Sequence, residues 1–420
     1  MGIVIGKSGK ETVKINNADR RSHFYIVGKT GTGKSTLIKN LVAQDIEKGR
    51  GVAVIDPHGD LVEDILNFIP KRRTNDVVYF NPADTAYPIG LNILEARGEE
   101  GKQLTASAFI SVCRHIWGDF WGPRSEFIMY NAVLAIMDTP GNTLLGVYRM
   151  LVDEKFRKRI VANVKDPMVR IFWQEDFENY NIKFQKEIIA PVQNKIGQLL
   201  TGAPLRNIVG QVKSSIDFRY IMDNGQILLA NLSKGRVGED RANLLGSVLI
   251  TKMYLSILGR QNIEEKERRD FYLYVDEFQN FATDAFSSIL SEARKYRLNL
   301  TLAHQYLDQL PEDIKRAVFG NVGAVATFRV GCMDAERLEV EFLPYFDREA
   351  LIKQKNYELV YKKLADGEAE DPSFANTFPP MQIKGDEADR EVIIKTSRQR
   401  YGREVSKVEG KIGKWFGGKT

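Results

Sequence analysis

Residues 26–36 have the types and spacing needed to hold a chain of phosphate groups. They read IVGKTGTGKST and fit the pattern GxxxxGK(S/T), with Gly28, Gly33, Lys34 and Ser35 at the specified positions. Glycines in such a loop let backbone N–H groups wrap phosphate oxygens, the lysine reaches the β- and γ-phosphates, and the hydroxyl ligates Mg²⁺. The apolar run FYIV precedes the pattern and the helical run TLIKNLVAQDIEKG follows it, which predicts a nucleoside-triphosphate site. We expect the nucleotide to contact Gly28, Thr30, Gly31, Thr32, Gly33, Lys34, Ser35 and Thr36.

Hydrolysis of a bound nucleotide needs further carboxylates, one in the Mg²⁺ shell and one to deprotonate the attacking water. Two nearly identical tetrapeptides offer such a pair, LVDE at 151–154 and YVDE at 274–277. The first follows apolar residues at helical spacing and precedes charged residues, which is typical of a helix surface. The second ends FYLYV, which is typical of a buried strand. We therefore predict that Asp276 ligates the metal and Glu277 is the catalytic base, with a helix cap as the alternative.

Two more polar residues end predicted strands. Gln305 follows LNLTLAH, where its amide would lie beside the γ-phosphate. There it would transmit the loss of that phosphate to the rest of the domain. Asp56 ends GVAVID, where it would line the nucleotide pocket or an interface between subunits. The guanine-recognition pattern NKxD has a partial match at 194–197 that lacks the acid, so ATP is the expected nucleotide.

The composition is that of a globular protein of 420 residues, 43% of them hydrophobic and 27% charged. Cys113 and Cys332 lie far apart, so neither a disulfide framework nor a cysteine metal site is predicted. The apolar run at 127–137 falls short of the roughly 18 residues that a membrane span needs, and we find no secretory signal. The expected location is the cytoplasm, or the membrane through partner proteins.

Short apolar runs rich in β-branched and aromatic residues alternate with segments of helical length. The runs occupy residues 23–28, 51–56, 76–81, 226–232, 271–277, 298–305 and 324–330. They are apolar throughout, which is typical of parallel strands covered on both faces. The fold class is therefore α/β, with a mostly parallel central sheet.

Helical patterns fill the long gap between the third and fourth runs, and we expect them to be interrupted at Pro140-Gly141 and at Pro191. The first residues suggest a hairpin around SGK. The predicted organisation is a β-hairpin at 1–20, a discontinuous P-loop domain at 21–95 and 216–345, an all-helical insertion at 96–215 and a C-terminal extension at 346–420.

These motifs together resemble the FtsK-HerA superfamily of motor ATPases, and within it the conjugative coupling proteins of type IV secretion (TraG/TraD type). The matching stretches are HFYIVGKTGTGKST, GVAVIDPHGDL, FYLYVDEFQNF and EARKYRLNLTLAHQ, with a helical domain inserted in the same interval. The resemblance covers roughly residues 20–345. It implies a RecA-like P-loop domain, ATP and Mg²⁺ as cofactors, and a hexameric ring that passes DNA through its channel. By the same resemblance Lys34 and Ser35 bind the nucleotide, Asp276 and Glu277 are the metal and water carboxylates, and Gln305 is the sensor.

Ring ATPases also complete the site with an arginine from the neighbouring subunit, which stabilises charge in the transition state. Arg294, in EARKYR, matches the family position best, and Arg329, at the end of VATFRV, is the alternative. A salt bridge at the surface is the non-catalytic explanation of either residue. Coupling proteins usually begin with membrane helices, whereas this chain starts at its first hairpin, so we expect a soluble relative or a chain without its anchor.

The C-terminal tail combines an apolar stripe with basic residues. Tyr401, Val405, Val408, Ile412 and Trp415 recur at steps of four and three, on one face of a helix. Seven Lys or Arg less two Glu leave the segment 396–420 with a net charge of +5. Docking on an adjacent subunit, binding of DNA and binding of membrane lipid all remain open for this helix.

We therefore predict an ATPase that acts as a hexameric motor. It would translocate double-stranded DNA in a conjugation-like or type IV secretion-related process, with the secretion or conjugation machinery as partner. One alternative is a secretion ATPase that acts on protein cargo. The other is a nucleotide-gated assembly module that binds ATP with little turnover.

Overall fold

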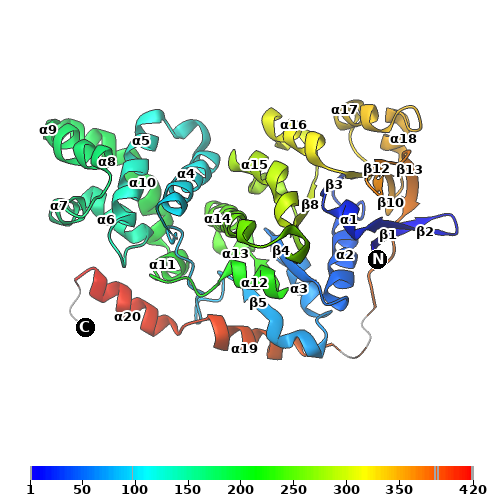
Figure 1. The fold of residues 1–420 in the computed structure, drawn as a ribbon, viewed down its shortest axis with the longest axis horizontal. Coiled ribbons are helices and arrows are strands. Elements are labelled where there is room, and N and C mark those ends of the chain that lie inside the picture. The colour runs from blue at the N-terminus through cyan, green and yellow to red at the C-terminus, as the bar shows by residue number, and fades with distance from the viewer. Residues whose placement is uncertain (1, 97, 383–384, 386, 418–420) are drawn as a thin grey trace. The chain divides into compact units, whose positions relative to one another are not determined.

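The computed structural model describes residues 2–96, 98–382, 385 and 387–417 (Figure 1). The chain forms two compact units. The first comprises the residues up to Phe80, Phe218–Ser233 and Ser256–Ser397, and the second comprises Asn81–Asp217, Lys234–Leu255 and the chain from Arg398. These boundaries differ from the predicted ones, because the first unit takes in both the N-terminal hairpin and most of the predicted C-terminal extension.

The first unit is built on an 11-stranded sheet in the order β2-β1-β13-β10-β9-β3-β8-β7-β4-β6-β5. Its central strands are β3 (Phe24–Val27), β4 (Gly51–Asp56), β5 (Val77–Phe80), β6 (Ile227–Asn231), β7 (Phe271–Val275), β8 (Leu298–His304) and β9 (Ala324–Thr327). They pair in parallel and every residue in them is buried. Burial on both faces explains why their sequences are apolar throughout. The α/β class and the mostly parallel sheet are confirmed.

The register of these strands brings their carboxyl ends to one edge of the sheet. Val27 of β3 pairs with His304 of β8, and Val275 of β7 pairs with both Leu302 of β8 and Ile55 of β4. The loops that follow β3, β4, β7 and β8 therefore emerge side by side, which is where open α/β sheets bind ligands.

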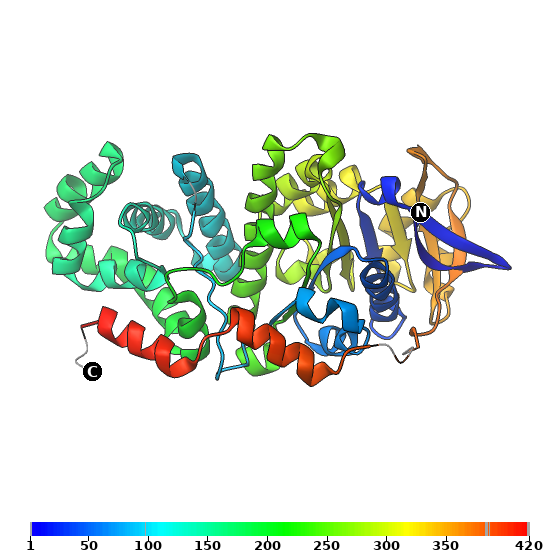
Figure 2. The ribbon, with the colours of Figure 1, turned by 60° about the horizontal axis from the view of Figure 1, so that its bottom comes forward.

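The outer strands are antiparallel and come from the two ends of the chain. β1 (Gly2–Ser8) and β2 (Glu11–Asn16) form the predicted hairpin, and β10 (Glu358–Lys362) and β13 (Ser373–Asn376) join it to β9. Figure 2 shows the hairpin in dark blue beside the orange strands. Gln44 fixes β1 on the underlying helix, since its side chain accepts from Val4 N and donates to Val4 O, both at 2.9 Å.

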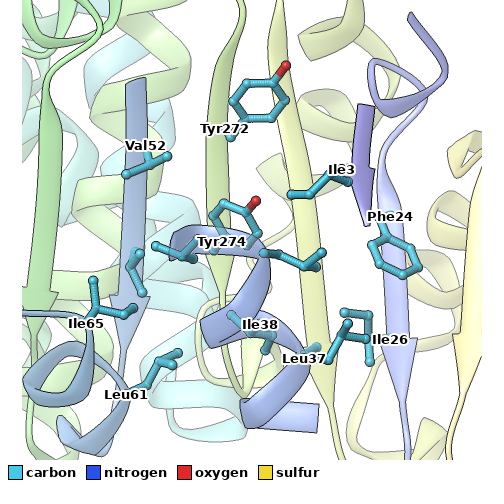
Figure 3. Packing of buried hydrophobic residues seen from close by; sticks show 14 of the residues in the cluster. Ile3, Phe24, Ile26, Leu37, Ile38, Val52, Leu61, Ile65, Tyr272 and Tyr274 are labelled. Atoms are coloured by element: carbon cyan, nitrogen blue, oxygen red, sulfur yellow. The ribbon is translucent and has the colours of Figure 1, made fainter. Parts of the chain in front are cut away.

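Helices cover both faces of the sheet. They include α1 (Asn17–Arg20), α2 (Lys34–Glu47), α3 (Asp60–Leu66), α12 (Phe218–Asn224), α15 (Ala285–Glu292), α16 (Glu312–Asn321), α17 (Cys332–Phe342) and α18 (Arg348–Lys353). Figure 3 shows Leu37 of α2 beside Ile26 of β3, within one continuous buried cluster. Each fully buried side chain of this size contributes about 1.5–3 kcal/mol. This packing sets the start of α2 against the end of β3.

A buried ion pair ties α1 to the core beneath the sheet. Arg20 donates to Asp45 Oδ1 at 2.9 Å and to Asp45 Oδ2 at 2.7 Å, and it also donates to the Tyr274 hydroxyl at 2.9 Å. The guanidinium lies 3.7 Å from the centre of the Tyr272 ring. Asp45 is 0% exposed and Arg20 is 5% exposed, so Arg20 depends on Asp45 for compensation of its charge, and Asp45 depends on Arg20 together with Arg50, which pairs with it at 2.7 Å.

The second unit is helical, and the described residues of 81–217 contain no strand. Its helices are α4 (Gly98–Trp117), α5 (Pro123–Met137), α6 (Leu144–Val152), α7 (Glu154–Val161), α8 (Pro167–Ile171), α9 (Phe177–Asn179), α10 (Ile182–Thr201), α11 (Ala203–Val209), α13 (Lys234–Val237) and α20 (Val405–Trp415), together with most of α14 (Glu239–Leu258). The expected interruption at Pro191 is wrong, because α10 runs through it. Ile188 and Val192 on either side are buried, so packing outweighs the backbone hydrogen bond that proline removes.

Helices α14 and α19 (Arg390–Tyr401) each belong partly to one unit and partly to the other. α19 begins in the first unit and ends in the second. The stretch Glu239–Asn262, which contains α14, is long and apolar enough to cross a membrane by length and composition, and 61% of its apolar window is buried. The core helix of a soluble protein passes the same test.

Candidate active site

The glycine-rich loop connects β3 to α2 and has the backbone of a phosphate cradle. Gly31 and Gly33 have φ of 76° and 120°, in the left-handed region that favours glycine. A Cβ on Gly28 would lie 2.6 Å from Cβ of Phe328, so a larger residue is excluded there by contact. Thr32 Oγ1 donates to Lys29 O at 2.7 Å and closes the loop. The loop thus presents backbone N–H groups at the N-terminus of a 14-residue helix, where anions bind well.

Lys34 is buried, and its ammonium group is held by the loop itself. Nζ donates to Gly28 O at 2.6 Å and to Lys29 O at 3.2 Å. Burial lowers the pKa of Lys34, and the charges of Glu277 and Asp276 partly offset this. The positive charge therefore lies inside the cradle, close to the two carboxylates. The side chains of Thr30 and Ser35 are exposed and that of Thr36 is half-buried, so all three are accessible at the loop surface.

Asp276 and Glu277 follow β7 directly, as predicted, and both are buried. Asp276 Oδ1 accepts from Glu277 N at 3.0 Å. Burial, followed by the charges of Glu277 and Asp56, raises the pKa of Asp276 from 3.8 to about 7. Glu277 has φ of 47°, a strained conformation for a residue with a side chain. A carboxyl with this pKa and a strained neighbour are features of functional sites.

Both oxygens of the Glu277 carboxylate accept hydrogen bonds from amides. Gln305 Nε2 donates to Oε1 at 2.9 Å, and Gln279 Nε2 donates to Oε2 at 2.7 Å. Gln305 was predicted from its position after β8, and the contact places it beside the carboxylate. Gln279 was missed, although it stands in the same EFQN stretch. The turn of the chain at Glu277 brings Gln279 back onto the carboxylate.

Asp56 lies at the same edge, at the end of β4. Its Oδ1 accepts from His58 N at 2.9 Å and its Oδ2 accepts from Val62 N at 3.1 Å. Burial raises its pKa. Both oxygens of Asp56 therefore stabilise the turn into α3. The negative charge of Asp56 contributes to the raised pKa of Asp276.

The other tetrapeptide, LVDE at 151–154, lies at the junction of α6 and α7 in the helical unit. Asp153 Oδ1 accepts from Phe156 N at 3.0 Å and caps α7, and Glu154 is exposed and pairs with Lys158 at 2.6 Å. Its assignment to a helix surface is confirmed.

The two candidate arginines lie at opposite ends of the parallel strands, Arg294 at their amino ends and Arg329 at their carboxyl ends. Arg294 is exposed in the 3₁₀ turn Ala293–Tyr296 that precedes β8. Burial, with a smaller contribution from the charge of Arg294, lowers the pKa of His23 just before β3. The seven residues of β8 separate Arg294 from Gln305, a rise of about 20 Å. Arg329 instead follows β9, where its O accepts from Lys29 N at 2.9 Å and its side chain donates to Asn356 Oδ1 at 3.0 Å. Arg294 thus cannot reach the glycine-rich loop of its own chain, whereas Arg329 adjoins that loop.

Tyr357 also contacts the glycine-rich loop, and no pattern in the sequence marked it. Its N donates to Thr32 O at 2.7 Å, and its Cδ1 lies 2.9 Å from where a Cβ on Gly33 would be. The residue has φ of 69° and its side chain is 49% exposed. Thr377 N donates to Tyr357 O at 2.8 Å, which links the loop to the outer strands.

The residues at this edge fit a magnesium nucleotide. Ser35 and Asp276 supply oxygen donors, which Mg²⁺ prefers over nitrogen or sulfur. Lys34 and the loop supply positive charge and N–H donors for phosphates. No group of three or more His, Cys, Asp or Glu that could hold a metal by itself occurs among the described residues, so the phosphates would have to complete the metal's coordination.

Comparisons with known proteins agree with this geometry. Residues 10–329 match the family described as type IV secretion-system coupling protein DNA-binding domain. The chain belongs to this family. It is 22% identical over 395 residues to the type 4 coupling protein DotL of Legionella pneumophila, an alignment that covers 79% of the chain and 49% of DotL. The chain thus spans about half the length of the curated relative it matches.

Solved structures support the fold. The plasmid coupling protein TrwB in complex with ADP and Mg²⁺ is similar with a TM-score of 0.63 and 15% identity, over 90% of this chain and 92% of that one. VirB4 of Thermoanaerobacter pseudethanolicus is similar with a TM-score of 0.64 and 16% identity, over 92% and 98% of the two chains. Together with the family match, these comparisons place the chain among the type IV secretion-related P-loop proteins of the FtsK-HerA type.

Proposed function

We propose that this protein is an ATP-driven motor that assembles as a hexameric ring and translocates double-stranded DNA in a type IV secretion-related process. The observation that carries the proposal is the environment of Glu277. It lies beside Asp276 and Lys34, and its carboxylate is oriented by Gln305 and Gln279. A protein that only held a nucleotide would need the glycine-rich loop but not a positioned carboxylate beside it.

The roles of the residues follow from the positions of their atoms. The loop N–H groups and Lys34 bind the phosphates. Ser35 and Asp276 would hold Mg²⁺, which would supply positive charge to offset that of the phosphates. Glu277 accepts a proton from the water that attacks the γ-phosphorus. The bond from that phosphorus to the β–γ bridging oxygen breaks, and ADP and phosphate leave. The hydrogen bond from Gln305 weakens when Glu277 is protonated and is lost when Glu277 is displaced, and β8 carries that change to the opposite end of the parallel strands.

Arg294 is the proposed arginine finger, acting on the neighbouring subunit. It lies about 20 Å from Gln305 along β8, so it can serve only a site on another copy. A site that needs two subunits for completion makes hydrolysis depend on assembly. Arg329, which adjoins the loop of its own chain, remains the alternative.

A steady-state ATPase assay with and without linear double-stranded DNA, across a salt series, tests the proposal. Stimulation by DNA that fades with salt and is absent in Lys34→Ala would support a DNA motor. A rate indifferent to DNA would overturn translocation and favour protein cargo. A rate near zero under all conditions would favour a nucleotide-gated assembly module.

Mixing of variants tests the arginine. Subunits with Lys34→Ala keep Arg294, and subunits with Arg294→Ala keep an intact loop, so mixed rings should regain activity if Arg294 acts between subunits. Arg316→Ala, at an exposed position on α16, is the matched control and should remain active alone. If mixing restores nothing while Arg329→Ala is inactive, the finger is Arg329.

A further inference from the structure

The helical unit contains a cavity of about 340 Å³ beneath the C-terminal helix α20. All of its lining residues belong to that unit, and they come from the start of α6, the segment after α11, and α20 with the turn before it. The volume falls within the range of cavities that bind small ligands. The cavity has no part in the nucleotide chemistry, so a ligand bound in it would be independent of the proposed function.

The wall of the cavity is apolar. Leu145 and Val408 are buried there, Ile412 and Trp415 are half-buried, and Val212 is 46% exposed at its edge. Val408, Ile412 and Trp415 belong to the apolar stripe predicted for the C-terminal tail, and Leu145 and Val212 line the same cavity. An acyl or other hydrocarbon group would therefore be enclosed by hydrocarbon and an indole ring.

Specific contacts hold α20 in place, so the cavity is a feature of the fold. Arg149 Nη1 donates to Trp415 O at 2.9 Å, and the Phe156 and Trp415 rings meet edge to face with centroids 5.6 Å apart. Asn207 Nδ2 donates to Glu409 Oε1 at 2.9 Å. Figure 2 shows α20 in red alongside the other helices of this unit.

The charge around the apolar wall has one sign. Lys213, Arg403, Lys407 and Lys411 line the cavity, and no carboxylate does. Of the nearby acids in the sequence, Glu404 pairs with Lys407 at 2.7 Å and Glu409 accepts from Asn207. Within the described part of the chain, the other three cations have no carboxylate partner.

We propose that this cavity binds an anionic phospholipid of a bilayer, with part of an acyl chain among Leu145, Ile412 and Trp415 and the phosphate between Lys213, Arg403 and Lys411. Only an anionic amphiphile uses both features. A nucleic-acid backbone would engage the cations and leave the cavity empty, and an uncharged apolar peptide would fill the cavity without needing the cations. Lysines beside an aromatic and aliphatic surface are typical of helices that lie at the surface of anionic bilayers.

Flotation of the full chain with vesicles gives the first test. We expect binding to phosphatidylglycerol vesicles that weakens with salt, and little binding to phosphatidylcholine vesicles. The double variant Lys213→Ala/Lys411→Ala should bind on the order of tenfold or more weakly. Lys414→Ala is the matched control, because Lys414 lies on α20 outside the cavity lining, and it should lose much less.

Quenching of Trp415 fluorescence by phospholipids brominated on their acyl chains gives the second test. The signal of Trp415 is the difference between the parent chain and Trp415→Phe. Quenching that disappears in Ile412→Glu, which puts a carboxylate in the cavity, would support the proposal. Binding of vesicles without Trp415 quenching would overturn it in favour of adsorption through charge alone. Equal binding of Lys213→Ala/Lys411→Ala and Lys414→Ala would overturn it, as would binding of duplex DNA but not of vesicles by this surface.

Discussion

The carboxyl of Asp276 makes the stability of the nucleotide-free protein depend on pH. Its pKa rises from 3.8 to about 7 because it is buried and lies near Glu277 and Asp56. The folded protein therefore keeps a proton that the unfolded chain releases, so the contribution is favourable at low pH and is lost as pH rises toward 7. A shift of about 3 pKa units corresponds to about 4 kcal/mol in total. Integrated between about pH 5 and about pH 8, the loss is about 2–3 kcal/mol.

Asp276→Asn removes this dependence with little change in shape, because an amide oxygen can accept the same hydrogen bond from Glu277 N. The assay is urea-induced unfolding of the first unit, measured with a chelator present and without nucleotide at several pH values between about 5 and about 8. From the lowest to the highest pH, the unfolding free energy of the variant should rise relative to that of the parent by about 2–3 kcal/mol. Asp313→Asn, an exposed carboxylate on α16, is the control and should run parallel to the parent. Parallel curves for Asp276→Asn as well would refute the reasoning.

Three other substitutions test the site and its support. Glu277→Gln should lower ATP turnover by on the order of 10²–10⁴ while nucleotide binding persists, as read by steady-state ATPase and by fluorescent-nucleotide titration. Tyr357→Pro removes the N–H that donates to Thr32 O and cannot adopt φ of 69°, so ATP affinity should fall about tenfold relative to Tyr357→Gly, which keeps both. Arg20→Met leaves Asp45 buried without its main partner and should cost about 3 kcal/mol in chemical denaturation.

Each substitution has an outcome that contradicts its argument. Full turnover in Glu277→Gln would remove this residue from the role of base. Equal affinities of the two Tyr357 variants would mean that the contact with the loop does not support nucleotide binding. An unchanged denaturation midpoint in Arg20→Met would mean that Arg50, which also pairs with Asp45 at 2.7 Å, compensates the charge alone.

The central sheet and the positions of the main candidate site residues within it were predictable because their signals are local. A buried parallel strand is apolar along its whole length, so FYLYV could be distinguished from the helical context of Asp153 and Glu154. The segments that follow these strands, which carry Lys34, Asp276 and Gln305, then had to emerge side by side, since parallel strands share their direction.

The remaining features depend on contacts between distant segments. Nothing within residues 358–376 indicates that β10 and β13 join the sheet, because an antiparallel strand needs its partner's register to be recognised. Tyr357 adopts a left-handed conformation that tyrosine rarely takes, so no turn signal marked it. Pro191 is tolerated because α10 is packed on both sides of it, which a local helix rule does not consider.

The sheet also determines when the protein can finish folding during synthesis. β1 is made before its partner β13, which ends at Asn376, so the hairpin keeps an unpaired edge while the segments between them are synthesised. At about 5–20 residues per second, that interval is on the order of 20–70 s. Tyr357, which contacts the glycine-rich loop, is translated in the same late stretch. Nascent chains therefore carry an incomplete nucleotide site and an open strand edge over this interval, and an open edge of this kind can pair with other chains.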